Sequence, residues 1–185
     1  MSYATVILVA GSPAPSSRST RVLDEIGRKV EEGGISTRRY GVRDFEPAEL
    51  LNADASSARL QAFIQAVQGA QALVVATPVY KATYAGALKL LLDVLPPEAL
   101  VGKTALAIAT ARIAAHFASV ERAFNDLFRF FRVGKELTPL LLTDEQVPAQ
   151  GSTYRLNDAA QASASLSARA LVDIVQPQGL ESPTN

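Results

Sequence analysis

The sequence predicts an α/β fold in which a doubly wound parallel sheet carries helices on both faces. Short apolar runs without polar alternation recur along the chain, as expected for strands that are buried on both sides. Each run is followed by a longer segment whose apolar residues recur every three or four positions, which is the period of an amphipathic helix. Five such units favour a five-stranded sheet in the order 2-1-3-4-5 over a six-stranded arrangement.

Five segments have the composition of strands. Pro78 directly follows the third and is expected to end it. Pro139 lies inside the last and cannot donate to a ladder, which predicts an edge position. The second alternates with polar residues and has the weakest pattern. The predicted strands are Thr5–Ala10, Ile35–Val42, Ala72–Thr77, Lys103–Thr110 and Glu136–Leu142.

The helical period appears between and after these strands. Gly33 and Gly34 end the first helix, and Pro96 and Pro97 end the third. Arg43–Asn52 contains a proline and is expected to be a connecting loop. The predicted helices are Ser19–Glu32, Ser56–Gly69, Tyr84–Leu95, Ala114–Phe131 and Leu156–Val175. Residues 1–176 are therefore expected to form one domain, followed by a disordered tail over residues 177–185.

Composition excludes several classes of function. The 185 residues include 18 basic and 18 acidic side chains, so no overall field attracts nucleic acid or an anionic membrane. There is no cysteine, which excludes disulfides, thiolate nucleophiles and cysteine-ligated zinc. The apolar run near the N-terminus is about six residues long and lacks a preceding basic segment, unlike a signal peptide or membrane span. We expect a cytoplasmic protein.

The loop after the first strand is rich in hydroxyl groups. In an open parallel sheet, ligands bind beyond the carboxyl ends of the strands, where the winding reverses. This loop has neither a GxGxxG fingerprint nor a Walker A motif, and it opens a helix whose first N–H groups suit a phosphate. Its polar residues are Ser12, Ser16, Ser17, Arg18, Ser19 and Thr20. A solvated loop with an ordinary serine N-cap explains the same residues equally well.

The segment after the third strand reads Thr77-Pro78-Val79-Tyr80-Lys81. A proline-stiffened strand exit can present backbone groups along the edge of a flat ligand, and Tyr80 can support an aromatic ring. Alternatively, Tyr80 and Tyr84 cover the top of the sheet or an oligomer contact, which is the favoured interpretation for Tyr84. The sole histidine, His116, fits a packed or capping role better than catalysis. No cluster has metal-ligand spacing, so no metal site is expected.

Three stretches together resemble the NAD(P)H-dependent FMN reductase family, in particular the FMN reductases of alkanesulfonate-utilisation systems. They are AGSP…SRST at residues 10–20, VATPVYKATYAGALKLLLD at residues 75–93 and GKTALAIAT at residues 102–110. The second is long and close to the family pattern, which makes it more specific than a serine-rich loop. The similarity extends from about residue 5 to residue 145. It implies a flavodoxin-like fold that binds FMN at the three loops.

The resemblance also implies a role for each loop. Ser12, Ser17, Arg18, Ser19 and Thr20 would hold the ribityl phosphate, and Pro78, Val79, Tyr80 and Lys81 would line the isoalloxazine edge. Many relatives have Thr-Gly-Gly after the fourth strand, whereas this chain has Thr110-Ala111-Arg112. Arg112 would then stabilise negative charge on the reduced flavin or pair with a phosphate of the pyridine nucleotide.

The implied reaction is hydride transfer from NADPH or NADH to FMN, in which the protein supplies orientation rather than an acid–base catalyst. The reduced flavin would pass to a partner flavin-dependent monooxygenase. A flavin-containing quinone, azo or metal-ion reductase is an alternative, whereas zero net charge disfavours a flavodoxin-type electron carrier. Family analogy implies a homodimer or homotetramer. Apolar side chains of the helices at Tyr84–Leu95 and Ala114–Phe131 could form its interface, although a buried core explains at least half of them.

Overall fold

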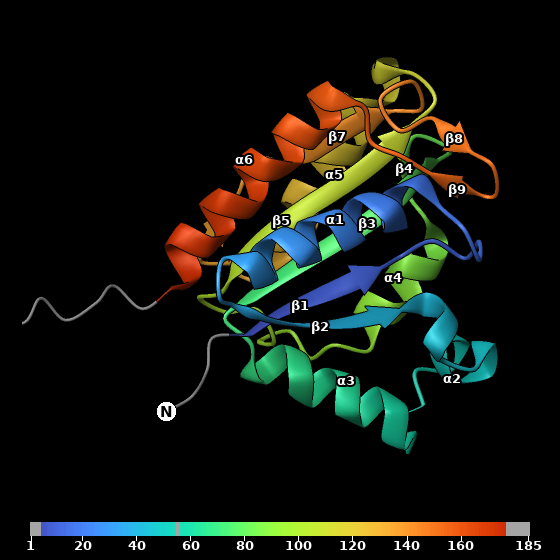
Figure 1. The fold of residues 1–185 in the computed structure, drawn as a ribbon. Helices are drawn as coiled ribbons and strands as arrows, with labels where there is room; N and C mark the ends of the chain where they lie inside the picture. Colours follow the sequence, from blue (N-terminus) through green and yellow to red (C-terminus); the bar gives the residue numbers. More distant parts are fainter. Residues whose placement is uncertain (1–4, 55, 177–185) are drawn as a thin grey trace, which may run out of the picture.

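The computed structural model describes residues 5–54 and 56–176, which form a parallel sheet between two layers of helices (Figure 1). The sheet has seven strands, and its main path runs β2-β1-β3-β5-β6. The strands of this path are β1 (Thr5–Ala10), β2 (Ser36–Gly41), β3 (Ala72–Tyr80), β5 (Thr104–Ala111) and β6 (Lys135–Glu136). All of its pairs are parallel. The fourth and fifth predicted strands correspond to β5 and β6, so the predicted order 2-1-3-4-5 is confirmed.

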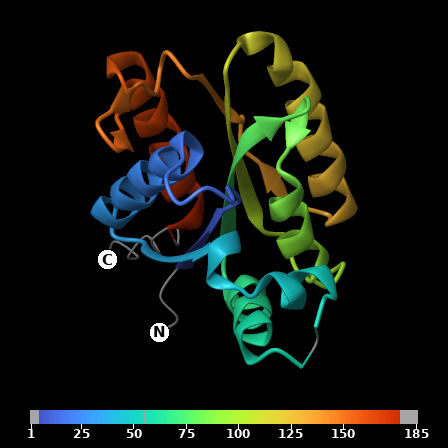
Figure 2. The same ribbon diagram turned by 90° about the vertical axis from the view of Figure 1, so that its right-hand side faces the viewer.

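Helices cover both faces because the central strands are apolar on both sides. α1 (Arg18–Glu32) and α6 (Asp158–Val175) pack on one face, against Val6 and Leu8 of β1. The other face carries Ile7 and Val9, and its helices lie on the opposite side of the sheet (Figure 2). These helices are α3 (Ala58–Gly69), α4 (Gly86–Asp93) and α5 (Phe117–Phe130).

The segment expected to be a plain loop, Arg43–Asn52, contains two short helical turns. They are the 3₁₀ turn η1 (Val42–Asp44) and the helix α2 (Pro47–Leu51). Proline is favourable in a first helical turn because its missing N–H would have no acceptor there. The Glu49 carboxylate also accepts a hydrogen bond from the Glu46 N–H, which completes a capping box. A proline inside a short segment without clear helical periodicity also fits a loop, so the sequence pattern does not predict α2.

Pro78 does not end β3, which continues to Tyr80. Residues Lys81 and Ala82 then turn the chain, both with positive φ (51° and 68°), into the short antiparallel strand β4 (Thr83–Tyr84). β1 pairs with β3 only as far as Ala76. Pro78 lies beyond that point, where no hydrogen bond to β1 is lost through its missing N–H. The third predicted helix therefore starts at Gly86 rather than at Tyr84.

Pro139 does mark the sheet edge, but it also divides the predicted strand Glu136–Leu142. Its two halves, β6 and β7 (Leu140–Thr143), both pair with β5. The segment after β7 forms a hairpin that was not predicted, with strands β8 (Ala149–Gln150) and β9 (Thr153–Tyr154). The 3₁₀ turn η2 (Ala114–His116) precedes α5. The predicted disordered tail lies outside the described residues.

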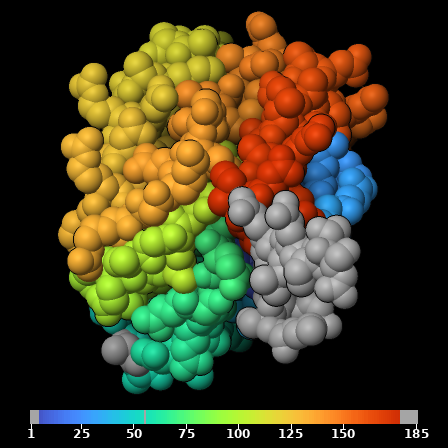
Figure 3. All heavy atoms as spheres, turned by 90° about the vertical axis from the view of Figure 1, so that its left-hand side faces the viewer, coloured from blue at the N-terminus to red at the C-terminus, as the bar shows by residue number. Residues whose placement is uncertain are grey.

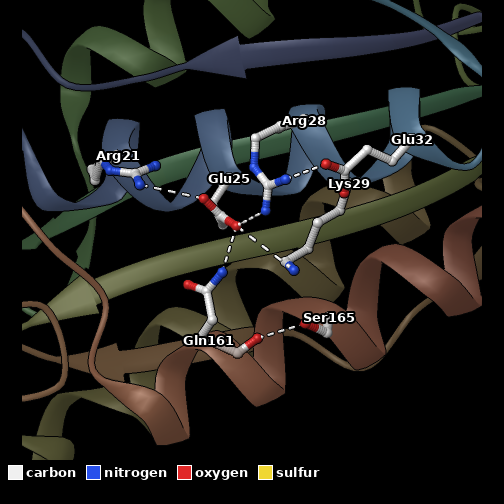
Figure 4. A network of polar contacts seen from close by, with 7 residues as sticks. All are labelled: Arg21, Glu25, Arg28, Lys29, Glu32, Gln161 and Ser165. Carbon is white, nitrogen blue, oxygen red and sulfur yellow. Dashed lines mark hydrogen bonds and ion pairs between the residues drawn. The ribbon is translucent and has the colours of Figure 1, made fainter.

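α1 and α6 are joined by a charged cluster around Glu25, which is buried at 4% exposure (Figure 4). Its carboxylate forms ion pairs with Arg21, Arg28 and Lys29 of the same helix. It also accepts a hydrogen bond from the Gln161 amide of α6. The hydrogen bond from Arg28, followed in importance by that from Gln161, lowers the pKa of Glu25 to about 2 against the opposing effect of burial. The carboxylate is therefore stabilised in its ionised form.

This cluster predicts a specific loss of acid stability. Because the folded-state pKa of Glu25 lies below its ordinary value of 4.5, its contribution is complete above about pH 5 and is lost as the pH falls toward 2. Glu25→Gln should lower the free energy of unfolding by about 2–3 kcal/mol at pH 7 and by roughly half of that or less at pH 3. Urea titrations at both pH values measure the difference.

Glu32→Gln is the matched control, since it removes a carboxylate that also pairs with Arg28 but is 59% exposed. It should cost less than about 1 kcal/mol at either pH. Equal losses for Glu25→Gln at pH 7 and pH 3 would contradict the assignment.

Candidate functional site

Gly11 brings the loop after β1 against β3. Its N–H donates a 2.7 Å hydrogen bond to the carbonyl of Ala76. A Cβ at this position would lie 2.7 Å from the Cβ of Leu88 and 2.9 Å from the same carbonyl oxygen. Both distances are too short for any side chain, so only glycine allows this contact. The loop at residues 12–17 is thereby fixed beside the end of β3.

The start of α1 provides hydrogen-bond donors beyond the carboxyl end of β1. Ser17 is the N-cap, yet its hydroxyl lies 2.9 Å from the hydroxyl of Ser19 and does not cap the helix. The first hydrogen bond of α1 runs from the N–H of Arg21 to the carbonyl of Ser17. The N–H groups of residues 18–20 therefore have no acceptor within the helix. Such groups, with the positive end of the helix dipole, favour an anion.

Thr77 fastens the β3–β4 hairpin on the other side of the site. Its fully buried hydroxyl accepts a hydrogen bond from the Ala85 N–H and donates one to the carbonyl of Pro78, both at 2.9 Å. Tyr80, the last residue of β3, is 48% exposed. An aromatic side chain in this position can contact the face or edge of a flat ligand.

These parts line one open cavity of about 290 Å³. It contains nine of the twelve predicted site residues: Ser12, Ser17, Arg18, Pro78, Val79, Tyr80, Thr110, Ala111 and Arg112. The other three do not line it, because Ser19 is buried beneath the first turn, Thr20 lies further along α1 and Lys81 is exposed in the hairpin turn.

Four further residues line the cavity: Ala14, Ser16, Asp144 and Tyr154. Ser16 belongs to the hydroxyl-rich loop that the sequence already singles out, whereas the other three were missed. Asp144 directly follows β7 and could have been found, since it lies at the same carboxyl edge of the sheet. Tyr154 belongs to β9, a two-residue strand that no pattern in the sequence predicts.

Arg18 points into the cavity wall formed by the segment after β7. Its Nε donates a 3.0 Å hydrogen bond to the carbonyl of Val147, and one terminal nitrogen lies 3.4 Å from a carboxylate oxygen of Asp144. Its guanidinium also lies over the ring of Tyr154, 4.7 Å from the ring centroid. The hydroxyl of Ser16 donates a hydrogen bond to the carbonyl of Ser152, which lies in the turn between β8 and β9. The hairpin β8–β9 is thus held against the start of α1.

A second cavity, of about 480 Å³, lies between the edge strand β7 and α6, which are neighbours on the surface (Figure 3). Its lining is dominated by aliphatic side chains such as Leu137, Leu142 and Leu166, and it holds no cationic side chain. Among residues 5–54 and 56–176, no group of three or more potential metal ligands comes together. His116 is exposed in η2 and does not line the cavity at the strand ends.

The donor set at the strand ends fits a mononucleotide. Hydroxyl groups, first-turn N–H groups and a guanidinium suit its phosphate, while the exit of β3 and the loop at residues 110–112 suit a flat ring system. Together, the sheet order and the position of this cavity place the chain among the flavodoxin-like α/β proteins.

Comparison with known proteins defines the family. Residues 4–138 match the model of the NADPH-dependent FMN reductases, and the chain belongs to this family of oxidoreductases. An FMN reductase (NADPH) of Escherichia coli K12 is 39% identical over 142 residues, which cover 77% of this chain and 74% of that protein. The NADH-dependent FMN reductase SfnF of Pseudomonas putida is 30% identical over 131 residues, which cover 69% and 70%.

Solved structures agree with this assignment. The apo form of the NADH:FMN oxidoreductase EmoB superposes with a TM-score of 0.83 and 25% identity, over 97% of this chain and 92% of that one. An archaeal flavodoxin superposes with a TM-score of 0.64 and 11% identity, which shows a shared fold. In the part of the chain that the structure describes, no helix is long and apolar enough to cross a membrane.

The Thr77 clamp predicts a difference between two similar substitutions. Thr77→Val keeps the shape of the side chain but leaves the buried N–H of Ala85 without its acceptor, which should lower the free energy of unfolding by about 1–3 kcal/mol. Thr77→Ser keeps the hydroxyl and should cost about 1 kcal/mol or less for the lost methyl group. Urea unfolding measures both, and a larger loss for the serine variant would refute the clamp.

Proposed function

We propose that this protein is an NAD(P)H-dependent FMN reductase that takes FMN in the cavity at the strand ends. One observation carries the proposal: a single cavity is lined both by hydrogen-bond donors that suit an anion, at the start of α1, and by the extended end of β3. When bound there, FMN supplies an acceptor for the hydride of a reduced nicotinamide. The protein's part is to bind and orient the reactants.

Each wall of the cavity has a proposed role. Ser12, Ser17 and the first-turn N–H groups of α1, including those of Ser19 and Thr20, donate hydrogen bonds to the phosphate, and Arg18 supplies positive charge. Residues 78–80 border the ring system along one edge. Arg112 is exposed at the cavity mouth, where its cation favours a phosphate of the pyridine nucleotide or charge on the reduced flavin.

The physiological setting is part of the same proposal. Residues 1–176 act as one flavin-binding unit in the cytoplasm, and the reduced flavin is supplied to a flavin-dependent monooxygenase of sulfur metabolism, as the alkanesulfonate-type resemblance implies. A homodimer or homotetramer belongs to the same proposal by family analogy. Near the two ends of α5, Ile113 and Phe130 are exposed apolar side chains. Phe124, Phe128 and Phe131, by contrast, are buried in the core.

The test is oxidation of NADPH and NADH by the purified protein, followed at the nicotinamide absorbance with FMN as the only acceptor. Oxidation that saturates at micromolar FMN is expected. Activity that appears only with quinone or azo acceptors would replace the proposal with a reductase that keeps its flavin, and no oxidation with any acceptor would refute both.

The phosphate end is tested by Arg18→Ala. Loss of a charge-assisted hydrogen bond should raise the dissociation constant of FMN by about tenfold and leave that of riboflavin, which lacks the phosphate, nearly unchanged. Quenching of flavin fluorescence on binding measures both constants.

Arg21→Ala removes the same charge from α1 outside the cavity and should leave the affinity for FMN unchanged. Equal weakening of FMN and riboflavin by Arg18→Ala would show that Arg18 acts on the shape of the cavity rather than on the phosphate.

A further inference from the structure

An acidic side chain stands among the anion donors of the cavity. Asp144 follows β7, and its backbone N–H donates a 3.0 Å hydrogen bond to the carbonyl of Ala111. This bond fixes Asp144 beside the loop at residues 110–112. Its side chain lines the same cavity as Ser12, Ser17 and Arg18, and it is 36% exposed. A carboxylate in this place can pair with a cation that would otherwise face a phosphate at the start of α1.

Asp144 also forms an ion pair with Arg18, the cation that the phosphate is proposed to bind. The contact from Arg18 to Asp144 is 3.4 Å, and the bond to the carbonyl of Val147 together with the ring of Tyr154 holds the guanidinium in this orientation. The guanidinium of arginine holds its N–H donors in a fixed planar arrangement. A guanidinium oriented toward the Asp144 carboxylate therefore has fewer donors available for a phosphate. The phosphate and the carboxylate therefore compete for one side chain.

We propose that Asp144 is an affinity-determining residue of the flavin site. Its carboxylate competes with the FMN phosphate for Arg18 and thereby keeps FMN exchangeable, as a substrate that leaves after reduction. This inference rests on the proposed function. Asp144 and Tyr154 lie beyond the residues that match the family model, which end at residue 138.

The experiment compares the affinities of FMN and riboflavin for the full-length protein and its Asp144→Asn variant. Asparagine keeps the size of the side chain and removes its charge. Asp144→Asn should lower the dissociation constant of FMN by about tenfold and change that of riboflavin by less than about twofold. Glu145→Gln is the matched control, because Glu145 is the exposed neighbour outside the cavity, and it should leave both constants unchanged.

A double-mutant cycle separates competition for Arg18 from direct repulsion between Asp144 and the ligand. In an Arg18→Ala background, competition is absent, so Asp144→Asn should change the affinity for FMN by less than about threefold. The same tenfold gain in that background would overturn the competition and leave simple repulsion. Urea midpoints of the variants show whether each is folded.

Two outcomes distinguish failure of this inference from failure of the proposed function. If the unmodified protein binds FMN, but Asp144→Asn binds it equally or more weakly, Asp144 does not limit the affinity and the inference alone is wrong. If the unmodified protein binds neither FMN nor riboflavin, the proposed function is wrong and the inference falls with it.

Discussion

The site depends on one backbone hydrogen bond, from the N–H of Gly11 to the carbonyl of Ala76. It carries the β1–β3 pairing one residue past the end of β1, so the hydroxyl-rich loop leaves the sheet directly beside β3. Leu88 of α4 fills the space that a side chain at residue 11 would need. Strand, loop and helix therefore meet at a distance that only glycine permits, and the loop that opens α1 takes its position beside β3 from this contact.

The sheet order and most of the cavity could be predicted because both follow from local pattern and one topological rule. Apolar strands such as Thr5–Ala10 and Thr104–Ala111 need cover on both faces, and parallel strands bring their carboxyl ends to one edge. Features decided by distant contacts were missed. β3 extends past Pro78 because Val79 and Tyr80 pair with β4. Tyr154 reaches the cavity through a hairpin whose strands have two residues each.

The interactions of Arg18 could not be predicted from the residues next to it in the sequence. Five hydroxyl-bearing residues surround it in the chain, and they suggested a cation free to meet a phosphate. In the structure its partners are Asp144, Val147 and Tyr154, which lie more than a hundred residues away in the sequence. The charge of a site is thus set by the folded surroundings of each side chain, and a count of cations near a motif overstates its attraction for anions.

The contact between α1 and α6 joins segments that are made at very different times during translation. The ribosome completes α1 early, whereas α6 follows every strand of the sheet in the chain. Until α6 emerges, Glu25 lacks its Gln161 partner, and the apolar side chains that α6 covers in the folded protein are open to solvent. A nascent chain that already contains its complete sheet therefore still exposes one unfinished face, and during that interval it is the form most open to chaperones and to aggregation.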